Sequence, residues 1–152
     1  MPTRKLIPDV ITDQTLVCLP ADATVRDAVL RMAQHRIAAV LVTDGTVLKG
    51  IFTERDLTVR VVAAGRDPAA TPLAAVMTAD PDTLGPDAPA SEALDLMERH
   101  RYRHLPVVRG AEVVGIVSIR DLYSEVRHGL EEEIKEREAF IFGSQFSVQT
   151  TP

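Results

Sequence analysis

Two segments of the sequence place a hydroxyl three residues before a carboxylate. Thr53 and Asp56 form the first pair, Ser118 and Asp121 form the second, and each pair follows a glycine and two apolar residues expected to lie on a strand. The free N–H groups at the start of a helix favour a phosphate, and a hydroxyl adds a further hydrogen bond. A carboxylate accepts hydrogen bonds from both hydroxyls of a ribose. These residue types at this spacing are suited to a nucleotide.

The same spacing is also that of a capping box, in which the hydroxyl and the acid bind the backbone N–H groups at a helix start. That interpretation needs no ligand and rests on local geometry alone. The two interpretations are not exclusive.

An arginine precedes each aspartate, at Arg55 and Arg120. A helix cap has no use for a cation, whereas a phosphate accepts charge-assisted hydrogen bonds that contribute about 1.5–3 kcal/mol each. Arg103, at the start of an expected strand, adds a second cation to the second site. Its counterpart in the first site is Ala38, and Glu54 adds a negative charge there. We therefore expect the second site to bind more tightly than the first.

Both segments close one unit of an internal repeat, in which residues 22–57 align with residues 87–122 without a gap. In each unit a helical stripe of apolar residues is followed by two β-branched runs around a glycine turn and then by a second helix. The sequence therefore predicts a mixed α/β (α+β) fold of two tandem β-α-β-β-α repeats. The repeats are expected to pack through their sheets with pseudo-twofold symmetry, with paired clefts between them. The pairs that carry the alignment include Asp22/Asp87, Ala28/Ala93, Met32/Met97, Arg36/Arg101, Gly45/Gly110, Gly50/Gly115 and Leu57/Leu122.

The chain is expected to divide into four stretches. The first repeat covers residues 1–64, a linker and the start of the second repeat cover 65–77, the second repeat covers 78–127, and a charged helix and tail cover 128–152. Two prolines and the lack of a lasting period mark the linker. Glycine is a poor helix former, so Gly129 is expected to interrupt or weaken the last helix.

The last helix carries a narrow apolar stripe through Val126, Leu130 and Ile134, which is suited to packing on a partner subunit. Three large apolar residues follow in the tail, Phe140-Ile141-Phe142. Two interpretations remain open for the tail: a segment that docks on a partner, or a cap on the chain's own core.

Composition excludes several classes of function. A net charge of −5 argues against nucleic acid or an anionic membrane as the main partner. The longest apolar run, Ile37–Val42, is too short to span a membrane, and the N-terminus lacks a signal-type apolar stretch. Cys18 is the only cysteine, so no intramolecular disulfide forms, and we expect it to be a small buried hydrophobe in a cytoplasmic protein.

The sequence gives no sign of a catalytic or metal-binding site. The four histidines are too scattered to predict a metal site, and no Walker-type loop, nucleophile elbow or catalytic carboxylate pair is present in the sequence. We therefore expect neither an enzyme nor a required cofactor.

Several motifs together resemble the CBS domain, named after cystathionine β-synthase. They are the repeat itself, the lead Met77-Thr78-Ala79-Asp80-Pro81, the strand Arg103-His104-Leu105-Pro106-Val107-Val108 and the two glycine-to-aspartate endings. The resemblance covers roughly residues 5–127. It implies a regulatory module that binds an adenosine-containing ligand between its repeats, such as AMP, ADP, ATP, S-adenosylmethionine or NADH.

The resemblance also implies roles for single residues. Asp56 and Asp121 would contact a ribose, and Thr53 and Ser118 would contact a phosphate or hydroxyl. Further phosphate contacts would come from Arg120 and Arg103, and the base at the second site would lie against Thr15, Leu16 and Val17. The first repeat departs from the family pattern at three positions. Ile11 replaces the methionine of the segment that opens the repeat, Leu41 replaces the proline of the strand, and Ala38 replaces the basic residue at the start of that strand.

The resemblance further implies a homodimer, because such modules commonly pair through their helices. The main hypothesis is then a ligand sensor that acts on an effector protein whose identity the sequence does not give. The alternative is a structural or interaction protein with vestigial clefts, and an enzyme subunit is the least favoured class.

Overall fold

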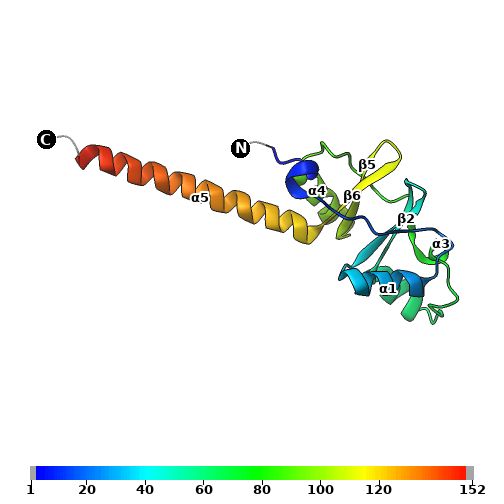
Figure 1. Ribbon diagram of the computed structural model, residues 1–152. Helices are drawn as coiled ribbons and strands as arrows, with labels where there is room; N and C mark the ends of the chain where they lie inside the picture. Colours follow the sequence, from blue (N-terminus) through cyan, green and yellow to red (C-terminus); the bar gives the residue numbers. More distant parts are fainter. Residues whose placement is uncertain (1–2, 150–152) are drawn as a thin grey trace.

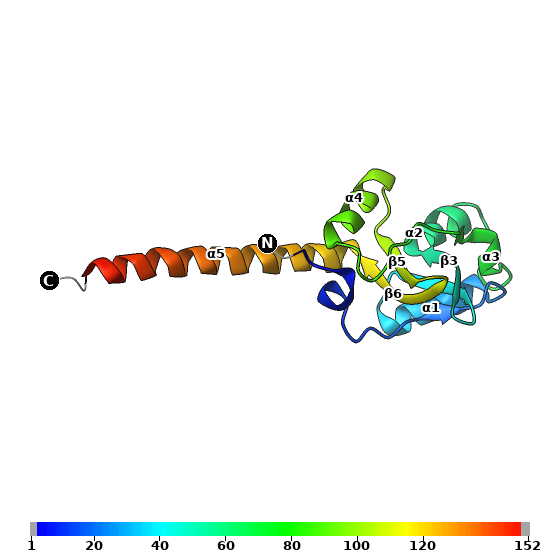
Figure 2. The ribbon, with the colours of Figure 1, turned by 90° about the horizontal axis from the view of Figure 1, so that it is seen from above.

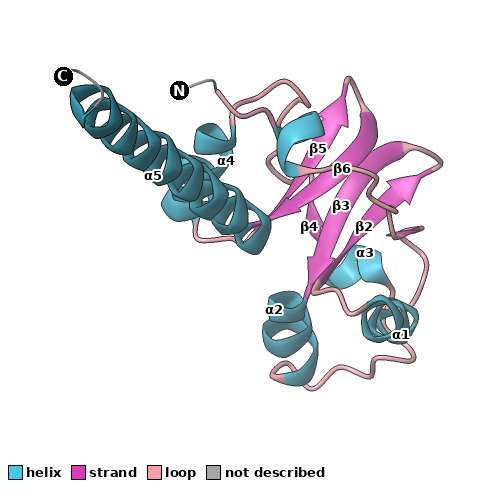
Figure 3. Ribbon diagram, turned by 60° about the vertical axis from the view of Figure 1, so that its left-hand side comes forward, coloured by secondary structure: helices cyan, strands magenta, loops and turns pink. Residues whose placement is uncertain are grey.

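The two predicted repeats share one mixed sheet of strand order β1-β2-β3-β6-β5, with β4 paired to β3 (Figure 3). The computed structural model describes residues 3–149 and their side chains as far as residue 142. The elements of the first half are η1 (Leu6–Val10), β1 (Cys18–Leu19), α1 (Val25–His35), β2 (Ala39–Asp44), β3 (Val47–Thr53), α2 (Glu54–Asp56) and η2 (Leu57–Val62). Those of the second half are α3 (Leu73–Val76), β4 (Thr78–Ala79), α4 (Ala90–His100), β5 (His104–Arg109), β6 (Glu112–Ser118) and α5 (Ile119–Gln149).

The two hairpins, β2–β3 and β5–β6, are built alike. Each turns at a glycine in the left-handed region, Gly45 with φ 61° and Gly110 with φ 64°, where other residues would be strained. Each also has a register shift at the same place, after Val42 in one and after Val107 in the other. The predicted repeat of β-hairpins is confirmed at the level of single residues.

The hairpins meet at their turns. Leu48 N donates to Ala111 O at 3.2 Å, and Val113 N donates to Thr46 O at 3.0 Å. Each hairpin thus donates one backbone hydrogen bond to the other. This reciprocal pairing gives the predicted pseudo-twofold arrangement. From the shared turn the strands run to separate ends, where β3 leads into α2 and β6 leads into α5 (Figure 3).

Helices α1 and α4 cover the two hairpins with equivalent apolar stripes. Val25, Ala28 and Met32 are buried on α1, as are Ala90, Ala93 and Met97 on α4. Both methionines are therefore core residues, as the helical spacing predicts. Each helix ends at an arginine with positive φ, Arg36 or Arg101, which turns the chain into the next strand.

The lead segment of each repeat packs on the core of the other. Leu6 and Ile11, near the N-terminus, lie in the core of the second repeat with Leu105 and Leu122. Leu73 and Val76, which follow the prolines of the predicted linker, lie in the core of the first repeat. The two halves are thus tied together by exchanged segments, which makes their separate unfolding unfavourable.

The predicted interruption at Gly129 is wrong, because α5 runs unbroken from Ile119 to Gln149. A single glycine costs a helix only about 1 kcal/mol relative to alanine. An ion pair between residues one turn apart spans it, with Arg127 Nε 3.1 Å from Glu131 Oε1, and a second follows it, with Arg137 Nη2 2.8 Å from Glu133 Oε1. The second helix of the repeat and the predicted charged helix are therefore one element.

Most of α5 extends away from the sheet, as Figures 1 and 2 show from two directions. Phe140 and Phe142 belong to this helix and are exposed, so the interpretation of the tail as a cap on the chain's own core is wrong. The predicted stripe residues Val126, Leu130 and Ile134 are also exposed. Among the described helices, none has a stretch long and apolar enough to cross a membrane.

The expectation that Cys18 is buried is wrong as well. Cys18 lies on the edge strand β1, where successive side chains point to opposite faces, and Leu19 is the one that enters the core. Partial burial nevertheless raises the pKa of the Cys18 thiol, and a hydrogen bond with Thr43 opposes that rise.

Candidate functional site

The end of β6 places Ser118 and Asp121 at the first turn of α5. Ser118 N donates to Asp121 Oδ2 at 2.9 Å, and Asp121 N donates to Ser118 Oγ at 3.1 Å. The predicted capping box is therefore present. Asp121 is exposed, and in the described part of the chain no lysine or arginine forms an ion pair with it. Its Oδ1 remains available to a ligand.

The end of β3 forms the same box with an additional partner. Thr53 N donates to Asp56 Oδ2 at 3.0 Å, and Asp56 N donates to Thr53 Oγ1 at 3.3 Å. The Nε of Arg60, one helical turn later, lies 3.6 Å from Asp56 Oδ1. Asp56 is also only 8% exposed. Both carboxylate oxygens of the first site are thus engaged within the protein.

The arginines of the second site lie around this helix start. Ile119 N donates to Arg103 O at 2.8 Å, which holds the residue before β5 against the first turn of α5. The side chains of Arg103 and Arg120 are both exposed. The backbone of both arginines therefore lies at the same turn as Ser118 and Asp121, and two cationic side chains so placed are suited to an anion.

The arginine of the first site points across to the second repeat. Arg55 Nη1 donates to the carbonyl oxygen of Arg101 at 3.4 Å. Arg101 ends α4, where the last carbonyls of a helix carry partial negative charge. The start of α2 and the loop before β5 therefore lie on facing sides of one interface between the repeats.

His104 lies at the same interface. It is the first residue of β5, is paired in register with Ser118, and is half-buried. Burial lowers the pKa of His104, while the nearby carboxylates of Asp121 and Glu54 oppose this change and the guanidinium of Arg103 adds to it. These groups come from both repeats, so His104 lies where the two predicted sites approach each other.

A side chain takes the place of a strand next to β6. Gln14 Nε2 donates to Ile116 O at 2.8 Å, and Ile116 N donates to Gln14 Oε1 at 2.9 Å. In the other half of the molecule, the backbone of β4 makes the corresponding contacts, pairing Thr78 with Ile51. The segment that crosses from the second repeat to the first, residues 14–17, is therefore anchored at Gln14. Its amide binds Ile116, which lies two residues before Ser118.

The predicted base-contact residues follow Gln14 directly. Val17 O accepts from Leu41 N at 3.0 Å, so Val17 belongs to the sheet of the first repeat. Thr15 is exposed and Leu16 is half-buried. These residues thus span from the β6 side of the molecule to β2, between the two repeats.

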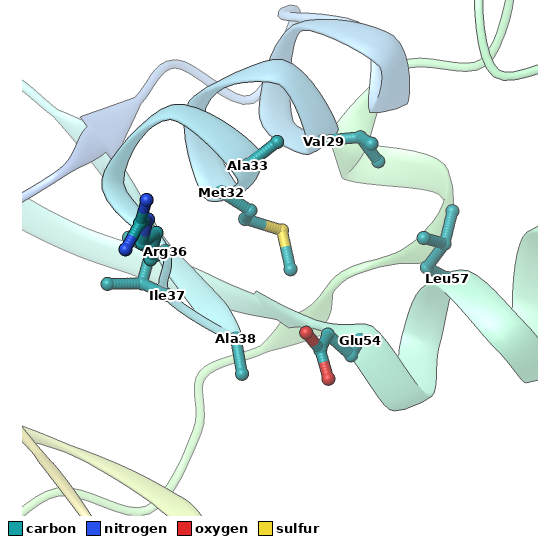
Figure 4. Close-up of a pocket in the computed structure, with 8 residues that line it drawn as sticks. All are labelled: Val29, Met32, Ala33, Arg36, Ile37, Ala38, Glu54 and Leu57. Atoms are coloured by element: carbon teal, nitrogen blue, oxygen red, sulfur yellow. The ribbon is translucent and has the colours of Figure 1, made fainter.

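A cleft with a volume of about 430 Å³ lies beside the first repeat, between α1 and the start of α2 (Figure 4). Met32 points into it, and Glu54 and Ala38 line one side. Ala38 and Glu54 occupy the positions that Arg103 and Ile119 hold in the second repeat. This cleft is mostly apolar. Alanine stands there in place of the second repeat's Arg103, and the Glu54 carboxylate stands in place of Ile119. Its full lining is Val29, Met32, Ala33, Arg36, Ile37, Ala38, Glu54 and Leu57.

The sequence model of the CBS domain matches this chain twice, over residues 8–63 and residues 73–128. The two matches cover more than half of the chain and coincide with the two hairpin units. The chain belongs to the CBS-domain family. The predicted resemblance is therefore confirmed, together with the tandem organisation of the fold.

Curated relatives of this CBS-domain protein include both short and long chains. YhcV of Bacillus subtilis (strain 168) is 36% identical over 116 residues, which are 76% of this chain and 81% of YhcV. The mitochondrial protein CBSX3 of Arabidopsis thaliana is 35% identical over 127 residues, 80% of this chain and 62% of CBSX3. CBSCBSPB3 of the same plant is 42% identical over 102 residues, 66% of this chain, but the match spans only 18% of CBSCBSPB3.

Solved structures of CBS-domain proteins have the same fold. A protein with CBS domains from Burkholderia ambifaria MC40-6 has a TM-score of 0.74 and 35% identity, covering 79% of this chain and 92% of that chain. PAE2072 from Pyrobaculum aerophilum, solved in complex with AMP, has a TM-score of 0.67 and 31% identity, covering 72% and 85%. A hexameric CBS-CP12 protein from bloom-forming cyanobacteria has a TM-score of 0.73 and 26% identity, covering 81% and 68%.

Sequence reasoning missed three residues of this region. Arg60 had a visible signal, because a cation four residues after Asp56 on a helix is positioned to pair with it. Gln14 had none, because its partner is a backbone group on a distant strand. His104 was considered only as a metal ligand, although its place at the start of β5 puts it opposite Ser118.

Proposed function

We propose that this CBS-domain protein is a regulatory module that binds an adenosine-containing nucleotide between its repeats and modulates a partner protein. The observation that carries the proposal is the exposed Asp121 carboxylate at a helix start that includes Ser118 and Arg120 and against which the backbone of Arg103 is held. The AMP complex of PAE2072, which has the same fold, supports adenine nucleotides as the class of ligand. AMP, ADP and ATP are the first candidates, and NAD(H) and S-adenosylmethionine share the same adenosine group.

Each side chain of the second site has a role that its chemistry suits. Asp121 Oδ1 accepts hydrogen bonds from the ribose hydroxyls while Oδ2 continues to cap the helix. Ser118 contacts a phosphate or ribose oxygen. Arg103 and Arg120 bind the phosphate, each contributing about 1.5–3 kcal/mol. These roles require no bond to be made or broken in the ligand, so we propose a non-catalytic function.

The base would lie against the crossing segment Thr15, Leu16 and Val17. Gln14 fixes that segment to β6 at one end, and Val17 is bonded to β2 at the other. A preformed wall of this kind reduces the conformational entropy lost on binding. Apolar and backbone contacts discriminate weakly between adenosine compounds, so the phosphates would set the preference.

The first site, built on Thr53, Arg55 and Asp56, is proposed to bind more weakly. Asp56 is paired with Arg60, and Arg55 is bonded to the second repeat. A ligand there has to replace these contacts before gaining its own. We therefore propose that occupancy of the second site dominates at low ligand concentration.

The same geometry offers a route from ligand to partner. Ser118 ends β6, and the next residue begins α5, whose exposed face extends away from the sheet (Figure 1). A ligand that joins Arg103 to Arg120 would favour one orientation of α5 over others. A ligand shifts such an equilibrium only by its difference in affinity for the two states.

Partner binding is proposed to use the exposed apolar residues, first in a homodimer and then with an effector. Leu30 on α1 and Val59 and Val62 on η2 are each more than half exposed, as are Leu130 and Ile134 on α5. Light scattering across the micromolar range tests the homodimer, and a monomer mass throughout would contradict it. The exposed α5 also favours a second function, an interaction protein whose clefts bind nothing.

A thermal-shift series distinguishes these functions. AMP, ADP, ATP, NAD, NADH and S-adenosylmethionine are added to the wild-type protein, to Asp121→Asn and to Asp95→Asn, an exposed control on α4. A ligand at 100 times its dissociation constant adds about 2.7 kcal/mol to the stability. We expect a shift with at least one compound in the wild type and in Asp95→Asn, and a much smaller shift in Asp121→Asn. No shift with any compound would favour the interaction protein.

A further inference from the structure

We propose that His104 is a phosphate-contact residue of the second site and that it takes up a proton when the nucleotide binds. The inference rests on the proposed function and adds to it a dependence of affinity on pH. It assigns a role to a side chain that the proposed set of ribose and phosphate contacts leaves out.

His104 lies beside the start of α5. The β5–β6 register places it directly opposite Ser118, so the imidazole lies next to the hydroxyl at the start of α5. Asp121, one turn into that helix, is close enough to influence its charge. A phosphate held by Ser118 and Arg120 would therefore lie within reach of the imidazole.

The surroundings of His104 are charged, and its side chain has no fixed partner among the described residues. It is half-buried, and within the described residues it has neither a hydrogen bond from its side chain nor an ion pair. Three charged groups face it: Asp121 from α5, Glu54 from α2 of the other repeat, and Arg103 from the loop before its own strand. The site thus holds a titratable group among charges that a ligand would alter.

The direction of proton transfer follows from these charges. Burial lowers the pKa of His104 most, and Arg103 lowers it further, so the free protein holds this residue neutral at pH 7. A bound phosphate brings negative charge and offsets the guanidinium of Arg103. Both effects favour the imidazolium, so the pKa of His104 is higher in the complex than in the free protein.

Linkage then sets the sign of the pH dependence. Because the complex binds the proton more tightly than the free protein, nucleotide affinity rises as the pH falls through the pKa of the complex and levels off below that of the free protein. A rise of about one pKa unit corresponds to an about tenfold gain in affinity between these limits.

The first repeat offers an internal comparison. Ala39 is paired with Thr53 there, as His104 is paired with Ser118 in the second repeat. An alanine cannot titrate, so a nucleotide in the first site would lack this contact. Proton-linked binding would therefore belong to the second site alone.

The test is a histidine NMR titration of the full chain, with and without saturating AMP. His104→Asn assigns the resonance, and His128, exposed on α5, is the internal control. We expect AMP to raise the pKa of His104 by about one unit and to leave the chemical shifts of His128 unaffected. Adenosine, which has no phosphate, should leave the pKa of His104 unchanged.

Calorimetry provides a second measurement that does not depend on the assignment. The phosphate of AMP titrates near pH 6 by itself, so the wild type is compared with His104→Asn at each pH from 5.5 to about 8. The gain in affinity on acidification should be about tenfold larger in the wild type. AMP binding with no change in the pKa of His104, or equal pH profiles of the two proteins, would overturn this inference alone. Failure to bind AMP at any pH would overturn the proposed AMP site together with it.

Discussion

The Nε of Arg60 lies 3.6 Å from Oδ1 of Asp56, the residue one helical turn before it. The position of Arg60 in the second repeat is taken by Glu125, whose Oε1 lies 3.1 Å from Nε of Arg4 in the N-terminal segment. One repeat therefore neutralises its motif aspartate with its own helix, and the other leaves Asp121 exposed. This difference separates a structural aspartate from one suited to a ligand.

Asp56→Ala is expected to reduce the free energy of unfolding by about 1–3 kcal/mol, because it leaves Thr53 N without its acceptor and removes the ion pair with Arg60. Asp121→Ala removes only an exposed capping interaction, which is typically worth about 1 kcal/mol. Urea denaturation of both variants measures the difference. Equal losses would contradict the assignment of a structural role to Asp56.

The arginines around Ser118 are expected to affect affinity without affecting stability. Arg103→Gln and Arg120→Gln should each weaken AMP binding by about 10- to 100-fold, the equivalent of one charge-assisted hydrogen bond. Arg109→Gln, exposed at the far end of the same hairpin, is the matched control. Calorimetric titration measures all three, and losses no larger than that of the control would remove these arginines from the site.

Gln14→Ala tests the side chain that takes the place of a strand beside β6. The change removes two hydrogen bonds to Ile116, and we expect it to lower the stability by about 1–3 kcal/mol. Gln34→Ala, exposed on α1, should change the stability by less than about 0.5 kcal/mol. Thermal denaturation of the two variants that gives the same midpoint would show that the contact contributes nothing.

The two equivalent glycines of the hairpins should respond differently to substitution. A Cβ on Gly50 would lie 2.6 Å from Met77 Sδ and 2.8 Å from the carbonyl oxygen of Thr78, so β4 has to move. A Cβ on Gly115 would lie 3.3 Å from Ile11 Cδ1, a flexible side-chain end. Gly50→Ala is therefore expected to destabilise by about 1–3 kcal/mol and Gly115→Ala by clearly less, as measured by urea denaturation. The reverse order would contradict the close packing of β4 on β3.

The repeat, the hairpins and both capping boxes followed from local patterns, and the structure bears them out. Met32 and Met97 lie on periodic stripes, and the pairs Thr53/Asp56 and Ser118/Asp121 have a spacing with a defined geometry. Such features depend on neighbours along the chain, which is why the sequence predicts them.

The remaining features depend on contacts between distant segments. Leu6 and Leu73 lie in short stretches without a period, so nothing local indicates that each enters the core of the other repeat. Nothing local distinguishes Gln14 from other polar residues, because its role depends on the fold placing β6 beside it. Gly129 stays helical because its neighbours stabilise the helix, although its own propensity disfavours it.

Calorimetric titration of AMP into the wild type, Asp121→Asn and Asp56→Asn, at one pH and salt concentration, compares the two sites directly. We expect Asp121→Asn to lose most of the affinity, by about tenfold or more, and Asp56→Asn to stay close to the wild type. Equal losses in the two variants, or a larger loss in Asp56→Asn, would contradict the assignment of the second site as the principal one.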